Sequence, residues 1–554
     1  MRVLIIVPRY SGGESVNYRY VFPLGLAYIS AILRRAGHEI RCLNLNHMAG
    51  PVGNLVAEQL RQYPTDYVLT GGVCAYYTSI RLVVEGVRLA GNGVKLILGG
   101  GLISSEPELM LETLSPDYLV VGEGEATIVE LLNALQTGTP IDNVAGLVYR
   151  GTDGQLKRTG ERRPIEPLDD LPYPDFDGFE YETLLANIRT TDDIAYFPED
   201  HPRPYPIIAS RACPYLCTFC YHPLGRKYRQ RSIDSIIAEL QQNLLRYRIN
   251  LIVLYDELFS QNKERVYEFC SRIKPLLASL PWTCRWLCYI RVDSVENEMM
   301  LTMKDAGCYL LSYGFESYSP IVIKSMRKHI TPTQIDKAIE LTMKHHLAMQ
   351  ANFIFGDLAE TQETAQETLN YFKSNGKAGI NLGFIWAYPG SDIYLGALKR
   401  GLIGDKLDFI VNRMETPTNM TAAMSDHEFE LLAATILYTN LKYSYFAVPR
   451  KVHLKGSRYT LSVECPHCQQ IIDYGNSELP GPFDSYALHC RSCYRRFYLV
   501  SRMGRLATHI TQSLLAARSP DLKRLGYRAI SAVRALSKRR AGAGVKAPNH
   551  QVKL

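Results

Sequence analysis

The chain alternates short apolar runs with amphipathic stretches, and this rhythm limits the folds that are open to it. In the first block, apolar runs rich in β-forming residues cover residues 3–7, 40–45, 67–73, 95–99 and 118–121. Amphipathic stretches such as 24–35 and 78–90 lie between them. Buried strands that alternate with helices are typical of a parallel, doubly wound α/β sheet. We therefore expect a Rossmann-like domain over residues 1–140.

Glycine-containing turns follow three of these expected strands. They are Gly71-Gly72, Gly99-Gly100-Gly101 and Gly122-Glu123-Gly124-Glu125. In a doubly wound sheet the ligand lies at the carboxyl ends of the strands. Because glycine has no side chain, it lets the backbone approach a bulky ligand closely. The turns therefore predict a ligand site at this edge of the sheet.

A second alternating block covers residues 204–400. Its expected strands are residues 206–210, 250–255, 283–289, 309–313, 350–355 and 381–387. About six βα units predict a partial (β/α)6 barrel of the TIM type, with the chemistry at the carboxyl ends of the strands. Residues 141–203 are richer in Pro, Asp and Gly, which predicts a linker between the two domains.

Three cysteines follow the first expected barrel strand directly. Cys213, Cys217 and Cys220 form a CxxxCxxC loop. Three thiolates can bind three irons of a 4Fe-4S cluster, and the fourth iron stays open to the amino and carboxylate groups of a ligand. A zinc site fits this spacing poorly, because zinc sites usually pair CxxC with a second CxxC or with two histidines. The loop therefore predicts an iron–sulfur centre.

This loop resembles the signature of the radical S-adenosylmethionine (SAM) superfamily. The resemblance implies that SAM binds the open iron and is cleaved to a 5′-deoxyadenosyl radical. It also implies that Asp256 and Glu257 accept hydrogen bonds from the SAM amino group. The other implied SAM contacts are Phe219 and Ile354 at the adenine and Glu316 and Ser317 at the ribose.

The later barrel segments agree with this resemblance in order and placement. Residues 388–391 match the usual end of the sixth strand. The fifth-strand loop departs from the family pattern, because its usual Pro-Gly is absent and Asp357 is atypical there.

Residues 1–140 look like the cobalamin-binding half of cobalamin-dependent radical SAM enzymes. The resemblance rests on residues 22–28, 98–101 and 121–125, and it implies a corrin ring near Gly99, Gly100, Gly101, Gly122, Glu123 and Gly124. The DxHxxG motif that often supplies a lower cobalt ligand is absent from the first loop. His47 begins an HxxG sequence but follows the second strand, so we interpret it as a solvated loop residue. A vestigial sheet that binds no corrin is the alternative.

Two CxxC pairs lie about twenty residues apart near the carboxyl terminus. Cys465, Cys468, Cys490 and Cys493 have the spacing of a tetrahedral site made of four thiolates. We expect a zinc ribbon over residues 461–500, and an auxiliary iron–sulfur cluster is the alternative. A helical extension, with a helix near residues 425–441, is expected over 401–460.

The end of the chain, residues 501–554, is basic. Apolar Leu522, Leu525, Ile530, Val533 and Leu536 recur at helical spacing among many lysines and arginines. Such a helix can lie on an anionic membrane, contact nucleic acid or dock on its own domain. We find no signal peptide and no apolar stretch long enough to span a membrane, so we expect a cytoplasmic protein.

These features together predict a cobalamin-dependent radical SAM methyltransferase that acts on an unactivated carbon or phosphorus centre. Its expected partners are a small-molecule substrate and an electron donor such as flavodoxin or ferredoxin. One alternative uses the same cofactors for oxidative cyclisation or rearrangement. The other is a redox- or cobalamin-responsive protein that binds nucleic acid, which we do not otherwise expect as a partner.

Overall fold

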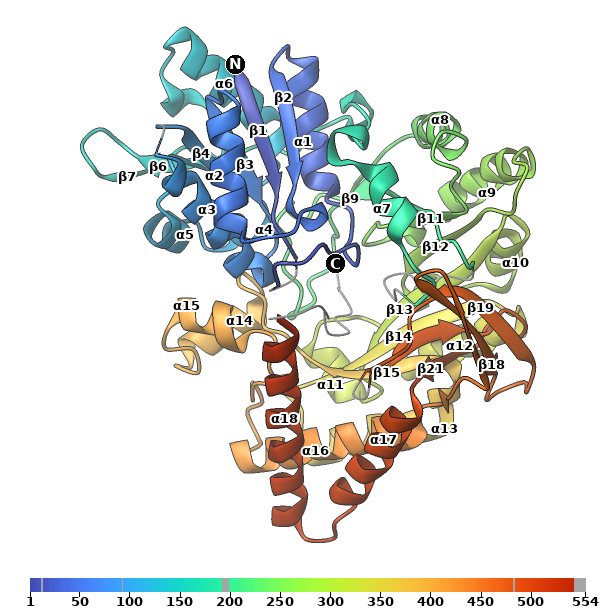
Figure 1. Ribbon diagram of the computed structural model, residues 1–554. Coiled ribbons are helices and arrows are strands. Elements are labelled where there is room, and N and C mark those ends of the chain that lie inside the picture. Colours follow the sequence, from blue (N-terminus) through green and yellow to red (C-terminus); the bar gives the residue numbers. More distant parts are fainter. Residues whose placement is uncertain (11–12, 92, 192–198, 482–483, 543–554) are drawn as a thin grey trace.

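Seven strands form the sheet of the amino-terminal domain (Figure 1). Five of them are parallel, in the order β2-β1-β3-β4-β5, and β6 and β7 extend the sheet in antiparallel fashion. The strands are β1 Arg2–Val7, β2 Glu39–Asn44, β3 Tyr67–Gly71, β4 Lys95–Gly99, β5 Tyr118–Val120, β6 Leu147–Arg150 and β7 Leu156–Arg158. The computed structural model describes residues 1–542 except 11–12, 92, 192–198 and 482–483. The last part of the expected basic tail, residues 543–554, lies outside the described residues.

Helices cover both faces of this sheet, as expected for a doubly wound fold. Val3, Ile5 and Val7 of β1 pack into one apolar cluster, whereas Leu4 and Ile6 pack into another. The first cluster includes α1 and α6, and the second includes α2, α3 and α5. The helices are α1 Leu24–Arg35, α2 Val52–Gln62, α3 Tyr77–Ala90, α4 Gly101–Ser105, α5 Pro107–Leu114 and α6 Gly124–Thr137.

The second block forms a parallel sheet of six strands in sequential order, which is the expected partial barrel. Its strands are β8 Pro204–Ile207, β11 Leu251–Leu254, β12 Arg285–Ile290, β13 Cys308–Glu316, β14 Ala348–Phe355 and β15 Ile380–Phe384. The helices along it are α8 Ile233–Leu244, α9 Lys263–Ala278, α10 Asn297–Asp305, α11 Pro320–Ser325, α12 Pro332–Lys344, α13 Gln362–Asn375 and α14 Asp392–Lys399. The order leaves β8 and β15 at opposite edges of the sheet.

The first barrel strand differs from its expected bounds of 206–210. It ends at Ile207, and the chain then forms a small antiparallel pair, β9 Ser210–Arg211 with β10 Arg229–Gln230. Asp256 explains the break, because its carboxylate accepts hydrogen bonds from the Ala209 amide at 2.6 Å and the Ser210 hydroxyl at 2.8 Å. The cysteine loop therefore begins beside the barrel and not within it.

The described part of residues 141–203, the expected linker, belongs to the folded structure of both domains. Its first part supplies β6 and β7 to the amino-terminal sheet. Its second part, with α7 Tyr181–Asn187, fills the space between the domains. The Phe176 ring lies 4.8 Å from Phe22 of the first domain and 4.8 Å from Tyr205 of β8. The two domains thus share one apolar core.

The carboxyl-terminal region joins a helical part to a ribbon. The helices are α15 Lys406–Asp408, α16 Asp426–Tyr443, α17 Arg502–Leu515 and α18 Pro520–Gly542. The ribbon contains β16 Phe446–Ala447, β17 Lys451–Lys455, β18 Arg458–Glu464, β19 Ile471–Ser477, β20 Tyr486–His489 and β21 Arg496–Leu499, in two small sheets. Within the described residues, no helix is long and apolar enough to cross a membrane.

Candidate active site

The three cysteines of the CxxxCxxC loop lie between β9 and β10, at the carboxyl end of the barrel. The Cys220 amide donates to the Cys217 carbonyl at 3.2 Å, so these two residues share one tight turn. Contact with the Cys220 thiol lowers the pKa of Cys217. Burial raises the pKa of the third thiol, Cys213, to about 11.

Two cations lie beside these thiols. The Lys328 ammonium, largely buried, donates to the Glu316 carboxylate at 3.0 Å and is close to Cys217 and Cys220. The positive charge of the Arg291 guanidinium also lowers the pKa of Cys217. Positive charge favours the thiolate form that binds metal. Sequence reasoning missed Lys328 and Arg291, because no spacing marks them and only the fold brings them to the loop.

The expected SAM contacts fall into two groups. Phe219 packs against the apolar cluster that contains Ile354, and it lies 5.8 Å below the Lys328 ammonium. Glu316 belongs to the same group, because it forms an ion pair with Lys328. Ser317 points elsewhere, because its buried hydroxyl lies 3.1 Å from the Thr368 hydroxyl of α13.

The two acidic residues after β11 also differ from each other. Asp256 is fully engaged with Ala209 and Ser210, and burial raises the pKa of Asp256 to about 6. Glu257 keeps 41% of its side chain exposed and lies 4.0 Å from His222. Partial burial and then the Asp256 charge raise the pKa of Glu257 to about 7. Asp256 thus positions the loop, and Glu257 is the acid available to a ligand.

The ligand edge of the first sheet faces this loop. In a sheet of order 2-1-3-4-5 the ligand lies where the order reverses, between β1 and β3. Tyr10 follows β1 and Tyr76 follows β3, with ring centres 4.2 Å apart. Tyr388, which follows β15, lies near both Tyr76 and Cys220. The edge that would hold a corrin and the cysteine loop therefore border one region.

The glycine turns at this edge have a backbone reason of their own. A Cβ on Gly71 would lie 2.0 Å from the Gly99 carbonyl oxygen, and one on Gly100 would lie 2.8 Å from that of Gly72. Gly100 and Gly122 also have positive φ angles, of 95° and 82°, which other residues rarely adopt. These glycines bring β3 and β4 together and keep the edge free of side chains.

Two polar residues of the first domain have partners that the sequence does not predict. Glu123 is expected beside the corrin, but both its oxygens accept from Arg229 at 2.9 Å, and Oε2 also accepts from the Ile165 amide at 2.6 Å. His47 is not solvated, because its side chain is only 3% exposed. Its ring nitrogens contact Tyr20 at 2.8 Å and Glu180 at 2.7 Å, so neither is directed at a cobalt ion.

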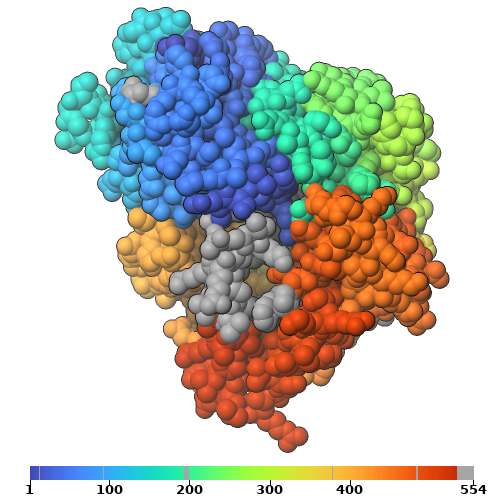
Figure 2. Space-filling model, viewed as in Figure 1, coloured from blue at the N-terminus to red at the C-terminus, as the bar shows by residue number. Residues whose placement is uncertain are grey.

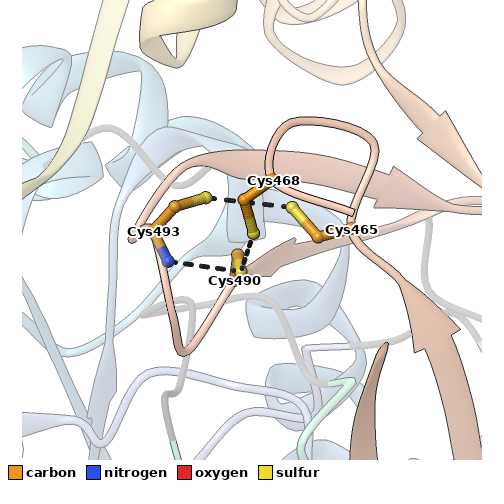
Figure 3. A group of neighbouring side chains, drawn as sticks. All are labelled: Cys465, Cys468, Cys490 and Cys493. Atoms are coloured by element: carbon orange, nitrogen blue, oxygen red, sulfur yellow. Dashed lines mark hydrogen bonds between the residues drawn. The ribbon is translucent and has the colours of Figure 1, made fainter. Parts of the chain in front are cut away.

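The four carboxyl-terminal cysteines converge on one point from the turns after β18 and β20 (Figure 3). All four sulfurs lie within 4.8 Å of one another. The Cys465–Cys493 sulfur distance is 3.8 Å and the Cys468–Cys490 distance is 3.6 Å. A tetrahedron with Zn–S bonds of about 2.3 Å has edges of about 3.8 Å. The tetrad therefore fits a single zinc ion.

Two family models match the chain. The B12 binding domain matches residues 16–132, and the Radical SAM superfamily matches residues 207–372. The uncharacterized methyltransferase PH0819 of Pyrococcus horikoshii is 28% identical, over 73% of this chain and 84% of its own length. The anaerobic magnesium-protoporphyrin IX monomethyl ester cyclase of Rubrivivax gelatinosus is 26% identical, over 77% of this chain and 75% of its own.

Among solved structures, the chain is similar in fold to the radical SAM methyltransferase TsrM of Kitasatospora setae. The TM-score is 0.59 and the sequence identity 17%, over 73% of this chain and 77% of the other.

Proposed function

The chain belongs to the cobalamin-binding radical SAM enzymes, and from this membership we propose that it transfers a methyl group to an unactivated carbon or phosphorus centre of a small molecule. The observation that carries the proposal is the shared border of the Cys213–Cys220 loop and the ligand edge of the first sheet, where Tyr388 lies near both Tyr76 and Cys220.

In this proposal Cys213, Cys217 and Cys220 hold three irons of a 4Fe-4S cluster. When bound, the cluster with SAM supplies a 5′-deoxyadenosyl radical, and cobalamin supplies the methyl group. Lys328 and Arg291 offset the negative charge of the thiolates. A flavodoxin or a ferredoxin is the proposed electron donor.

The ligands are held by side chains from both domains. Phe219 and Ile354 pack on adenine, Glu257 accepts from the SAM amino group, and Glu316 is held toward the ribose by Lys328. The glycines of the first sheet, Gly99, Gly100, Gly101, Gly122 and Gly124, leave room for a flat corrin ring. Partly buried aromatic side chains such as Tyr10, Tyr76 and Tyr388 reduce the access of water to the region between them.

The similarity to a cyclase favours one second candidate, which is oxidative cyclisation with the same cofactors. The two reactions differ in what becomes of SAM. Methyl transfer yields S-adenosylhomocysteine together with 5′-deoxyadenosine, whereas cyclisation yields only the latter.

The test uses full-length protein, reconstituted with iron, sulfide and cobalamin under anaerobic conditions. It is incubated with methyl-labelled SAM, a reductant and a small-molecule extract from cells that lack the gene. We expect label in a new product and both SAM-derived products in similar amounts. The Cys217→Ser variant is the control, and it should yield neither the labelled product nor the two SAM-derived products. A new product that contains no label would refute methyl transfer and favour cyclisation.

A further inference from the structure

The helical hairpin of α17 and α18 exposes a row of large apolar side chains. On α17 they recur at intervals of three and four residues, so they form one stripe. Their exposed fractions are 66% for Met503, 61% for Leu506, 53% for Ile510 and 49% for Leu514. Leu522 and Leu525 of α18 are 61% and 57% exposed. Single exposed apolar residues are ordinary on a protein surface, but a continuous stripe marks a binding surface.

The other face of α17 is fixed to the protein, so the stripe is not the result of a loose helix. The Gln512 amide donates to the Leu441 carbonyl of α16 at 2.7 Å. Leu515 is fully buried, and Ser501 caps the start of the helix by accepting from the Gly504 amide at 3.0 Å. The stripe therefore points outward from a helix whose orientation is set by its buried side.

The second helix is also held in place, by ion pairs. The Arg528 guanidinium binds both oxygens of Glu430 of α16, with contacts of 2.8 Å, and Lys523 donates to the Thr435 hydroxyl at 2.9 Å. The beginning of the basic tail thus docks on its own domain. Figure 1 shows that the turn between α17 and α18 lies at the end of the molecule away from the first domain, and that α18 runs from this turn back toward the middle of the molecule. Figure 2 shows the hairpin on the surface of the molecule.

Basic residues lie at both ends of the stripe. Exposed Arg502 precedes it, and exposed Arg518 lies in the turn between α17 and α18. Residues 501–554 contain twelve lysines and arginines but one aspartate, whereas the whole chain has a net charge of only +7. The remainder of the chain is therefore net negative, and the positive charge is concentrated at the hairpin and the residues that follow it.

We propose that the α17–α18 hairpin docks the protein on the surface of a membrane that contains anionic lipids. A helix with an apolar stripe flanked by basic residues lies in the interface, where the stripe enters the apolar boundary and the cations meet lipid phosphates. Nucleic acid would satisfy the charge but would leave the stripe in water. This inference does not depend on the reaction that the enzyme catalyses.

The test is co-sedimentation of the full-length protein with vesicles of phosphatidylcholine, alone or mixed with phosphatidylglycerol. We expect binding to the mixed vesicles that weakens as salt is raised. The double variant Leu506→Glu/Ile510→Glu should bind at least about tenfold more weakly, because two charged side chains replace two apolar ones that would enter the apolar boundary. Tenfold corresponds to about 1.4 kcal/mol. Leu454→Glu is the matched control, because Leu454 is 65% exposed on β17, outside the hairpin, and it should bind as the wild type does.

Three outcomes would overturn the proposal. One is no binding to the mixed vesicles. A second is equal binding by the wild type and the double variant when both unfold at the same temperature. The third is a wild type that is dimeric by light scattering and a double variant that is monomeric, which would assign the stripe to a second copy of the chain.

Discussion

Glu123, which follows the last parallel strand of the first sheet, accepts hydrogen bonds from Arg229 of β10 on both of its carboxylate oxygens, each at 2.9 Å. Both side chains are almost completely buried. Arg211 of β9 adds contacts of 3.2 Å to Glu123 and 2.6 Å to Glu125. The two arginines lie on the two sides of the cysteine loop. The first domain therefore holds the loop at both of its ends.

The first prediction concerns this ion-pair network. Glu123→Gln leaves the buried Arg229 charge without its partner, which should lower the free energy of unfolding by about 3–5 kcal/mol and reduce the iron bound per chain. Iron and sulfide content after reconstitution, with chemical unfolding, measure both effects. The control is Glu106→Gln, because buried Glu106 also joins the first domain to later segments, but through Tyr394 and Lys406 and not through Arg211 or Arg229. Equal iron content in the two variants would show that the network does not position the loop.

The second prediction concerns the charge of Lys328. Replacement by methionine removes a largely buried cation beside Cys217 and Cys220, so the reduced cluster, which carries one more negative charge, is stabilised less. The reduction potential should fall by on the order of tens of millivolts. A redox titration followed by paramagnetic resonance measures it. Lys324→Met is the matched control, because Lys324 is an exposed lysine of neighbouring α11. A potential that does not change in Lys328→Met would contradict the assigned role.

The third prediction concerns the metal of the ribbon. Cys465→Ser should lose about one zinc per chain and keep its iron, as measured by elemental analysis. The ribbon contacts the barrel edge, where Arg496 donates to the Ile380 carbonyl at 3.2 Å and Tyr498 to Asn381 at 2.8 Å. Hydrogen exchange of β15 should therefore become faster. Cys288→Ser, at a buried cysteine of β12 outside the tetrad, should retain the zinc. Loss of iron in place of zinc would indicate an auxiliary cluster.

The fourth prediction concerns pH. Burial raises the pKa of Glu360, in the loop after β14, from 4.5 to about 8. The unfolded chain releases this proton at lower pH than the folded protein does, so the free energy of unfolding should fall as the pH rises from about 5 to 8. Glu360→Gln should reduce the change in the free energy of unfolding over this pH range by up to a few kcal/mol. Chemical unfolding at several pH values measures it, and Glu363→Gln, at an exposed neighbour, should leave the slope unchanged. A slope that persists in Glu360→Gln would assign it to other groups.

The local patterns of the sequence were sufficient for the two α/β blocks and for both cysteine sets. The buried face of a strand or helix is visible as a periodic pattern of apolar residues that are close in sequence. A ligand loop such as Cys213–Cys220 is recognised by the spacing of residues only a few positions apart. For this reason the expected barrel strands agree with the structure except near their ends. The break after Ile207 was not predictable, because it depends on Asp256, which lies almost fifty residues further on.

Only the tertiary structure decided which partners the buried polar groups have. Glu123 is paired with Arg229, His47 with Glu180 and Lys328 with Glu316. The fold also decided that residues 147–158 form strands of the sheet, because the edge of β5 was open to them. A buried charge must find an opposite charge or a hydrogen bond wherever the fold supplies one. That requirement acts through space, over separations of up to 300 residues in the pair of Glu106 with Lys406, and leaves no spacing in the sequence that could reveal it.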